Sequence, residues 1–225
     1  MHQVRATTFH PQPLPRAIRD SLLMQAGGCA IFDHIPSAEM CTRLLAESSR
    51  CLHGAVASAI TTSDSEEVRG GSPARRFISA GGGSEQAEFY HCPATARFLA
   101  EICNAPVRPT GQSGTYTYYA RPGDHLALHR DIVTCDITLV TCLLDRHRDG
   151  STGGLTRFYP RRQHELLSRI RATPSNGAIS IRLPVGSSMV IFGGLVPHLI
   201  DPLAHGELRI VSILCFSVLA SWDLS

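Results

Sequence analysis

The part of the sequence that follows Gly111 consists of short runs rich in Thr, Tyr, Val and Ile, separated by clusters of Gly, Pro and Asp. Runs of this kind predict short β-strands joined by turns. We expect strands at residues 115–120, 135–144, 155–159, 178–183, 188–192 and 209–219. Because six or more strands follow one another within about 105 residues, the pattern predicts a β-sandwich or a β-barrel.

The first 110 residues have a different character. A short apolar run predicts a strand at 29–35, and helical spacing of apolar residues behind Pro36-Ser37 predicts a helix at 38–49. A second helix is expected at 94–103, where a proline comes just before the helical pattern. Between the helices, residues 61–85 are rich in Ser, Gly and charged residues, so we expect a long mobile loop there.

No linker separates the two halves, so we expect a single domain over residues 1–225. In this interpretation residues 1–110 form a helical and loop-rich support with a lid, and residues 111–219 form the β core. Of the 225 residues, 43% are hydrophobic and 18% are charged, which excludes a fully disordered or collagen-like chain. The formal net charge of +2 excludes obligate binding to nucleic acid or to an anionic membrane.

The sequence has neither a run of eighteen apolar residues nor a signal-peptide pattern at its start, so we expect a soluble, cytoplasmic protein. Its eight cysteines are scattered through apolar stretches, and no two form a CxxC pair. We therefore expect these cysteines to be reduced and mostly buried.

His129 and Asp131 stand two residues apart after the turn at 121–124. In extended backbone such residues project to the same side, so an imidazole and a carboxylate can converge. His198, after the expected strand at 188–192, is the candidate third ligand. Two histidines and one carboxylate on one face of a metal ion suit non-haem Fe(II). The alternative is that these are polar turn residues that face solvent.

Arg209 begins the otherwise apolar strand at 209–219. Alternation places it on the same face as Val211 and Ile213, which predicts a guanidinium that points into the core. A buried cation needs an anionic partner, and a guanidinium can bind the carboxylate of a small acid through two hydrogen bonds. The alternative is a strand-end arginine that extends to water.

In their order and spacing these motifs resemble the Fe(II)/2-oxoglutarate-dependent dioxygenases, particularly their prolyl-hydroxylase-like branch. The resemblance covers about half of the chain, roughly residues 111–219. It rests on R-P-G-D at 121–124, H-R-D ending at Asp131, G-G-L at 153–155, P-V-G-S-S-M-V-I-F at 184–192, and then His198 and Arg209.

The resemblance implies a mainly β fold with flanking helices and a double-stranded β-helix core of the jelly-roll, cupin-like type. It also implies Fe(II) held by His129, Asp131 and His198, O2 as the oxidant, and 2-oxoglutarate with its distal carboxylate on Arg209. Tyr118 or Tyr119 would reach the 2-oxoglutarate. Many members carry a serine two residues after the arginine, where this chain has Val211, so the second hydrogen-bond partner of the co-substrate is open.

The implied activity is that of an oxidoreductase that hydroxylates an unactivated C–H bond and releases succinate and CO2. Since no recognition domain is attached, we expect a small-molecule substrate, such as an amino-acid derivative or a specialised metabolite. Arg75 and Arg76, in the polar loop, are candidate substrate contacts. Two alternatives stay open: a hydroxylase of a peptide or protein residue, and a barrel-type metal-binding protein without oxidative chemistry. The sequence carries no signal for the oligomeric state.

Overall fold

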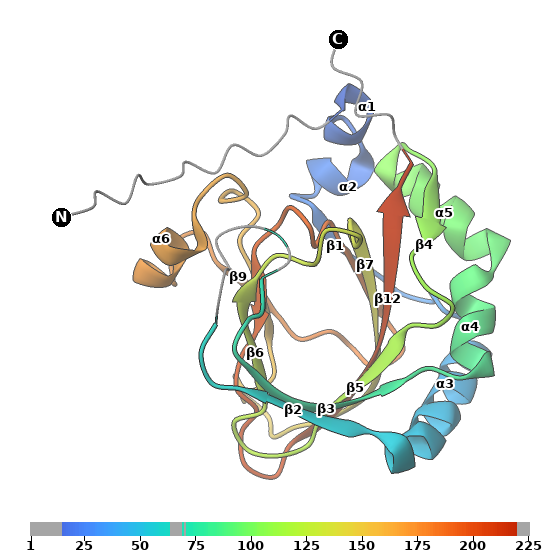
Figure 1. Cartoon of the computed structure of the whole chain (residues 1–225), viewed down its shortest axis with the longest axis vertical. Helices are drawn as coiled ribbons and strands as arrows, with labels where there is room; N and C mark the ends of the chain where they lie inside the picture. The colour runs from blue at the N-terminus through green and yellow to red at the C-terminus, as the bar shows by residue number, and fades with distance from the viewer. Residues whose placement is uncertain (1–14, 64–68, 70, 220–225) are drawn as a thin grey trace.

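The computed structural model describes residues 15–63, 69 and 71–219. Its strands, in chain order, are β1 (Cys29–Phe32), β2 (Val56–Ile60), β3 (Arg75–Gly81), β4 (Val107–Pro109), β5 (Thr115–Tyr119), β6 (His125–His129), β7 (Ile137–Arg146), β8 (Thr156–Phe158), β9 (Ile179–Ile181), β10 (Ser188–Ile191), β11 (His198–Ile200) and β12 (Leu208–Val218). They form one sheet in the order β1-β10-β7-β12-β5-β3-β6-β11-β8-β9, with β2 beside β3 and β4 beside β12. The sheet curls so that β7, β12 and β5 face β6 and β9 across the molecule (Figure 1). This mainly β, jelly-roll architecture confirms the fold class that the sequence predicts.

Helices cover the outside of this curled sheet. They are α1 (Arg16–Arg19), α2 (Leu22–Gln25), α3 (Ala38–Cys51), α4 (Ser84–His91), α5 (Pro93–Cys103) and α6 (Leu167–Ala172), with a short 3-10 helix, η1 (Leu52–Gly54). Figure 1 shows α3, α4 and α5 along the side formed by β5 and β12, and α6 on the opposite side. The helices expected at 38–49 and 94–103 are confirmed. No helix in the described residues is both long and apolar enough to cross a membrane.

The two faces of the sheet bury different side chains. The main core lies between the sheet and the helices and includes Leu44 of α3, Leu99 of α5 and Tyr118 of β5. A smaller apolar cluster on the inner face contains Tyr119 and Val211. Because successive strand residues point to opposite faces, neighbouring tyrosines of β5 serve the outer core and the barrel interior respectively.

The expectation of a loop over residues 61–85 is wrong for residues 75–81, which form β3. This strand pairs with β2 along one part of its length and with both β5 and β6, so it connects the two sides of the barrel. Its sequence, R-R-F-I-S-A-G, is polar and ends in glycine, but pairing with three strands and burial of Ala80 outweigh the local propensity. The expected strands also lack β2, β4, β6 and β11. Of these, β6 ends with one candidate histidine ligand and β11 begins with the other.

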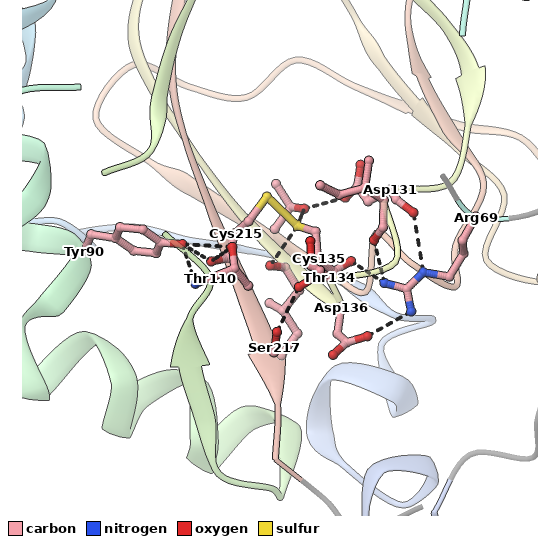
Figure 2. Close-up of a disulfide and its surroundings, with 12 residues drawn as sticks. Arg69, Tyr90, Thr110, Asp131, Thr134, Cys135, Asp136, Cys215 and Ser217 are labelled. Carbon is pink, nitrogen blue, oxygen red and sulfur yellow. Dashed lines mark hydrogen bonds and ion pairs between the residues drawn. A yellow bond between two sulfur atoms is a disulfide. The ribbon is translucent and has the colours of Figure 1, made fainter. Parts of the chain in front are cut away.

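Cys135 and Cys215 form a disulfide, so the expectation of reduced cysteines is wrong for this pair. Figure 2 shows the bond joining the segment before β7 to the middle of β12, beside the Tyr90 hydroxyl, which donates to the carbonyl of Cys215. The two cysteines are 80 residues apart and meet only because β12 pairs with β7. The other six are free, and burial raises the pKa of Cys29 and of Cys103 to about 12.

We expect reduction of the Cys135–Cys215 bond to lower the free energy of unfolding by about 2–4 kcal/mol, because the bond restricts a long loop in the unfolded chain. Urea unfolding with and without a dithiol reductant measures this difference. The Cys135→Ser/Cys215→Ser double variant is the control and should unfold identically in both conditions. Alkylation of all eight cysteines in the denatured, unreduced protein, read by mass spectrometry, would contradict the assignment.

Candidate metal centre and co-substrate pocket

The pairing of β6 with β11 brings the two candidate histidine ligands together. His129 is the last residue of β6, His198 is the first residue of β11, and the two are directly paired. Their ring centroids lie 4.3 Å apart, and both side chains are buried. Residues far apart in the sequence therefore meet because two short strands are in this register.

Asp131 lies two residues beyond the end of β6 and completes the cluster. Its Oδ1 lies 3.4 Å from His129 Nε2 and 3.6 Å from His198 Nε2. One candidate ligand atom from each of the three residues lies within 4.8 Å of the others. Metal–ligand distances of about 2.0–2.2 Å place three such donors around one ion. The donor set, two imidazoles and one carboxylate, fits non-haem Fe(II).

Main-chain carbonyls hold both imidazoles in the form that a metal requires. His129 Nδ1 lies 2.9 Å from the carbonyl oxygen of Ala127. His198 Nδ1 lies 2.9 Å from the carbonyl oxygen of Val196. Because a carbonyl oxygen only accepts hydrogen bonds, each Nδ1 carries a proton, and in the neutral form of such a ring Nε2 presents the lone pair. The two lone pairs are therefore on the ring atoms nearest Asp131.

Burial and neighbouring groups favour the protonation states that bind a cation. Burial, with a further contribution from His129, lowers the pKa of His198 to about 4, so this ring is neutral at pH 7. Burial alone would raise the pKa of Asp131, but the two histidines and the Thr138 hydroxyl together bring it below its usual range. At neutral pH the cluster thus offers an ionised carboxylate beside a neutral His198.

Two residues that the sequence analysis missed shape the carboxylate ligand. The Thr138 hydroxyl donates to Asp131 Oδ2. A Cβ atom at Gly193 would overlap the same Oδ2, so only glycine fits between this carboxylate and the backbone. The carbonyl of Gly193 also accepts a hydrogen bond of 2.8 Å from the backbone N–H of Asp131. In the sequence Thr138 looks like an ordinary strand residue, and Gly193 looks like part of an ordinary turn.

Arg209 lies inside the barrel and is 1% exposed. It pairs with Tyr119 across β12 and β5, on the inner face that the sequence alternation predicts. Its guanidinium donates to the carbonyl of Gly154 and has Nη2 at 3.5 Å from Thr156 Oγ1. Its buried Nε has no hydrogen-bond partner within the described chain. The guanidinium is therefore only partly satisfied by protein groups.

The described residues place no acidic side chain in an ion pair with Arg209. Asp145, its register partner on β7, is bound instead by Arg182, whose Nη1 lies 3.0 Å and 3.2 Å from the two carboxylate oxygens. Burying a guanidinium without an opposite charge is costly. A bound anion would supply that charge, and a carboxylate matches the planar fork of the arginine.

The arginine and the three ligands face one interior region. Thr156, which contacts Arg209, pairs with Ile200, and His198 lies two residues earlier on the same strand, β11. Two residues along a strand span about 7 Å and point to the same face. This arrangement suits a short dicarboxylate with one end at the ligand cluster and the other at Arg209.

The two tyrosines proposed from the sequence lie on opposite faces of β5. Tyr119 is buried inside the barrel opposite Arg209, and its ring packs edge-on against Phe77. Tyr118 points outward, where its hydroxyl donates to the carbonyl of Ser48 in α3 at 2.6 Å. The expectation that Tyr118 could reach the co-substrate is therefore corrected, because its side chain belongs to the outer core.

The two candidate substrate arginines also separate. Arg76 Nε lies 3.1 Å from the buried carboxylate of Asp124, and Arg76 also donates to the carbonyl of Pro122. This side chain holds the turn between β5 and β6, so the structure does not bring it to the ligand cluster. Arg75, one residue earlier, shares the inner face with Phe77 by alternation and donates from Nε to Ser58 Oγ at 2.8 Å.

We expect Gly193→Ala to weaken metal binding by about 10- to 100-fold, because its methyl group would displace the Asp131 carboxylate. Calorimetric titration of the metal-free protein with Co(II) measures the change. Gly54→Ala is the matched control, since a Cβ at that position meets no atom within 4 Å. Equal affinities for Gly193→Ala and the wild type would contradict the assigned site.

We expect the metal-free protein to lose stability as the pH falls from about 6.5 to 4. In this window the unfolded state protonates His198, whose folded pKa is about 4, before the folded state does. The contribution is at most about 1.4 kcal/mol per pH unit. Urea unfolding at a series of pH values, with EDTA present, should show this slope in the wild type and a smaller one in His198→Asn. An identical slope in both proteins would contradict the assignment of this pH dependence to His198.

No protein-family model and no curated protein sequence matches the chain. Solved structures do. AviO1 from Streptomyces viridochromogenes Tue57 aligns with a TM-score of 0.64 at 19% identity, over 86% of this chain and 91% of AviO1. SnoK, a non-haem α-ketoglutarate-dependent carbocyclase from nogalamycin biosynthesis, aligns with a TM-score of 0.63 at 13% identity, over 90% of this chain and 83% of SnoK.

A prolyl-4-hydroxylase from Pseudomonas putida aligns with a TM-score of 0.56 at 16% identity, over 89% of this chain and 96% of the hydroxylase. Sequence identities this low support a shared fold and nothing more. The shared fold extends over most of each aligned structure. The chain therefore has the jelly-roll fold of the 2-oxoglutarate/Fe(II) oxygenases, prolyl hydroxylases included, as the resemblance in its sequence implies.

Proposed function

We propose that the protein is an Fe(II)- and 2-oxoglutarate-dependent oxygenase that oxidises a C–H bond of a small organic molecule. The observation that carries the proposal is the buried Arg209, which has no acidic partner in the described chain and faces the same interior region as His129, Asp131 and His198. A set of three metal ligands alone would fit many activities. The same three ligands with an anion-binding arginine nearby fit an enzyme that binds a chelating keto acid.

In this proposal His129, Asp131 and His198 hold the ferrous ion. The bound metal and keto acid supply the activation of dioxygen, with succinate and CO2 as co-products. The protein contributes ligand geometry, through the fixed imidazole tautomers, and an apolar cluster that includes Val211 and Leu203 beside the polar groups of the interior. The core at 111–219 carries all of these groups, and the N-terminal half supports it.

Three residues would hold the far carboxylate of 2-oxoglutarate. Arg209 supplies the charge, and the Thr156 hydroxyl beside it supplies a second donor. The Tyr119 hydroxyl would be the third, since this buried residue stands opposite Arg209 on the neighbouring strand. Val211 contributes only apolar contact, and Ser212 faces the opposite way and accepts from Gln86 Nε2 at 2.8 Å. Thr156 would therefore replace the serine that many relatives carry.

The substrate would lie at the open coordination positions, on the side of the inner face where Arg75 stands. Arg75 is partly exposed and uses Nε for its bond to Ser58, so its terminal nitrogens can bind an anionic group of the substrate. An amino-acid derivative or an acidic specialised metabolite fits this description. The comparison with SnoK, a carbocyclase, supports a small substrate.

Two alternatives make different predictions. A hydroxylase of a peptide residue is supported by the likeness to prolyl hydroxylases, and it would release succinate only with a peptide. A metal-binding protein without oxidative chemistry would bind Zn(II) at the same three ligands and would not bind 2-oxoglutarate.

We expect release of succinate that requires Fe(II), air and 2-oxoglutarate, measured by NMR with a panel of acidic small molecules. Arg209→Lys should raise the KM for 2-oxoglutarate by about 10-fold and Arg209→Ala by about 100-fold, because a charge-assisted bond contributes about 1.5–3 kcal/mol. Arg157→Ala is the control, since this arginine pairs with Asp201 at 3.0 Å.

Calorimetry of 2-oxoglutarate binding to the Co(II)-loaded protein gives the same comparison without turnover. Unchanged affinity in Arg209→Ala would exclude the proposed role of this arginine. Tight Zn(II) binding with no 2-oxoglutarate binding and no succinate from any substrate would favour the non-oxidative alternative.

A further inference from the structure

Arg69, in the connection between β2 and β3, binds the segment that carries the carboxylate ligand. Its Nη2 lies 2.8 Å from the carbonyl of Ile132 and 2.7 Å from that of Cys135. Its Nη1 forms an ion pair of 2.9 Å with Asp136. Figure 2 shows the guanidinium enclosed by this segment, on the side away from the disulfide. One side chain from a distant part of the sequence therefore satisfies several acceptors of residues 131–136.

The same arginine reaches the backbone of Asp131 itself. The Asp131 N–H donates to the carbonyl of Gly193 at 2.8 Å, and its carbonyl accepts from Arg69 Nε at 3.4 Å. The Thr138 hydroxyl holds one carboxylate oxygen. The other oxygen, Oδ1, is the one that faces the two histidines. Arg69 thus supplies one of three contacts that orient this ligand.

Gly194 provides independent support for this position of the Arg69 guanidinium. A Cβ at Gly194 would overlap the Arg69 guanidinium and would lie 2.7 Å from its Nε. The three atoms nearest to that Cβ all belong to Arg69. The adjacent glycines therefore make room for two different groups: Gly193 for the Asp131 carboxylate and Gly194 for the Arg69 guanidinium.

The segment has little apolar packing of its own. Ile132 is 56% exposed and Val133 is 69% exposed, although both side chains are apolar. Cys135 is the one buried residue of this segment, so the exposed part depends on hydrogen bonds for its conformation. Several groups restrain it from outside: Arg69, the disulfide at Cys135, and β12, where Ser217 Oγ donates to the carbonyl of Thr134 and the backbone N–H of Val218 donates to Asp136 Oδ2. Of these, Arg69 is the one that also reaches the backbone of Asp131.

We propose that Arg69 is a positioning residue for the metal centre: by binding residues 131–136 it fixes the direction of the Asp131 carboxylate toward the two histidines. The inference rests on the proposed metal centre. It extends the set of functional residues beyond the ligands to a side chain from the N-terminal half. Groups that orient a ligand typically change metal affinity 10- to 100-fold when they are removed.

The test measures metal affinity in the full-length, metal-free protein. We expect Arg69→Met to raise the Kd for Co(II) about 10-fold or more and to change the visible absorption of the bound Co(II). Arg69→Lys, which keeps the charge but not the planar fork, should lie between Arg69→Met and the wild type. Arg43→Met is the matched control, because Arg43 also joins two elements through ion pairs, with Glu85 and Glu88. It should leave the Kd unchanged.

A double-variant cycle tests the position of the guanidinium. Gly194→Ala alone should weaken Co(II) binding, because its methyl group displaces Arg69. In the Arg69→Ala background the same change should have little further effect, since the overlapping group is gone. Additive effects of the two substitutions on Kd would overturn the proposal.

The outcomes separate this inference from the proposed function. If the wild-type protein binds no Co(II), the assigned metal centre is wrong, and both proposals fail with it. A wild type that binds Co(II), with Arg69→Met lowering the melting temperature but not the affinity or the spectrum, would overturn only the role of Arg69. The melting temperature of each metal-free variant therefore accompanies each titration.

Discussion

The site depends on the register between β6 and β11. In that register His129 stands opposite His198, and a shift by one residue would turn one of the two imidazoles to the other face of the sheet. The strands are short, so the register is stabilised by their neighbours: β8 pairs with β11, and β3 pairs with β6. The curled sheet thus acts as the frame that places two distant histidines against one carboxylate.

The interior of this frame concentrates polar groups that a purely structural core would avoid. Arg209 is buried and has no acidic partner in the described chain, and the Asp131 carboxylate faces two imidazoles. A buried guanidinium without an anionic partner reduces stability unless a bound anion completes it. A cation at one end and a carboxylate at the other would satisfy both, which is why the two features favour a common function over two separate roles.

The sequence predicts the parts of the site that depend on local periodicity. Strand alternation places His129 with Asp131 and turns Arg209 inward, and both arrangements follow from residues two apart. The contacts of Thr138 and Arg69 with the ligand segment could not be predicted, because they depend on which distant segments meet. The same holds for β3, whose polar sequence becomes a strand only between partners, and for the disulfide, which needs β7 beside β12.

The most direct test of the central claim is a crystal structure of the protein prepared without oxygen and soaked with Fe(II) and 2-oxoglutarate. The account predicts one ferrous ion bound by Nε2 of His129, Nε2 of His198 and Oδ1 of Asp131, chelated by the keto acid, with the far carboxylate of the acid on the guanidinium of Arg209. A metal bound elsewhere, or a keto acid whose far carboxylate lies away from Arg209, would contradict it.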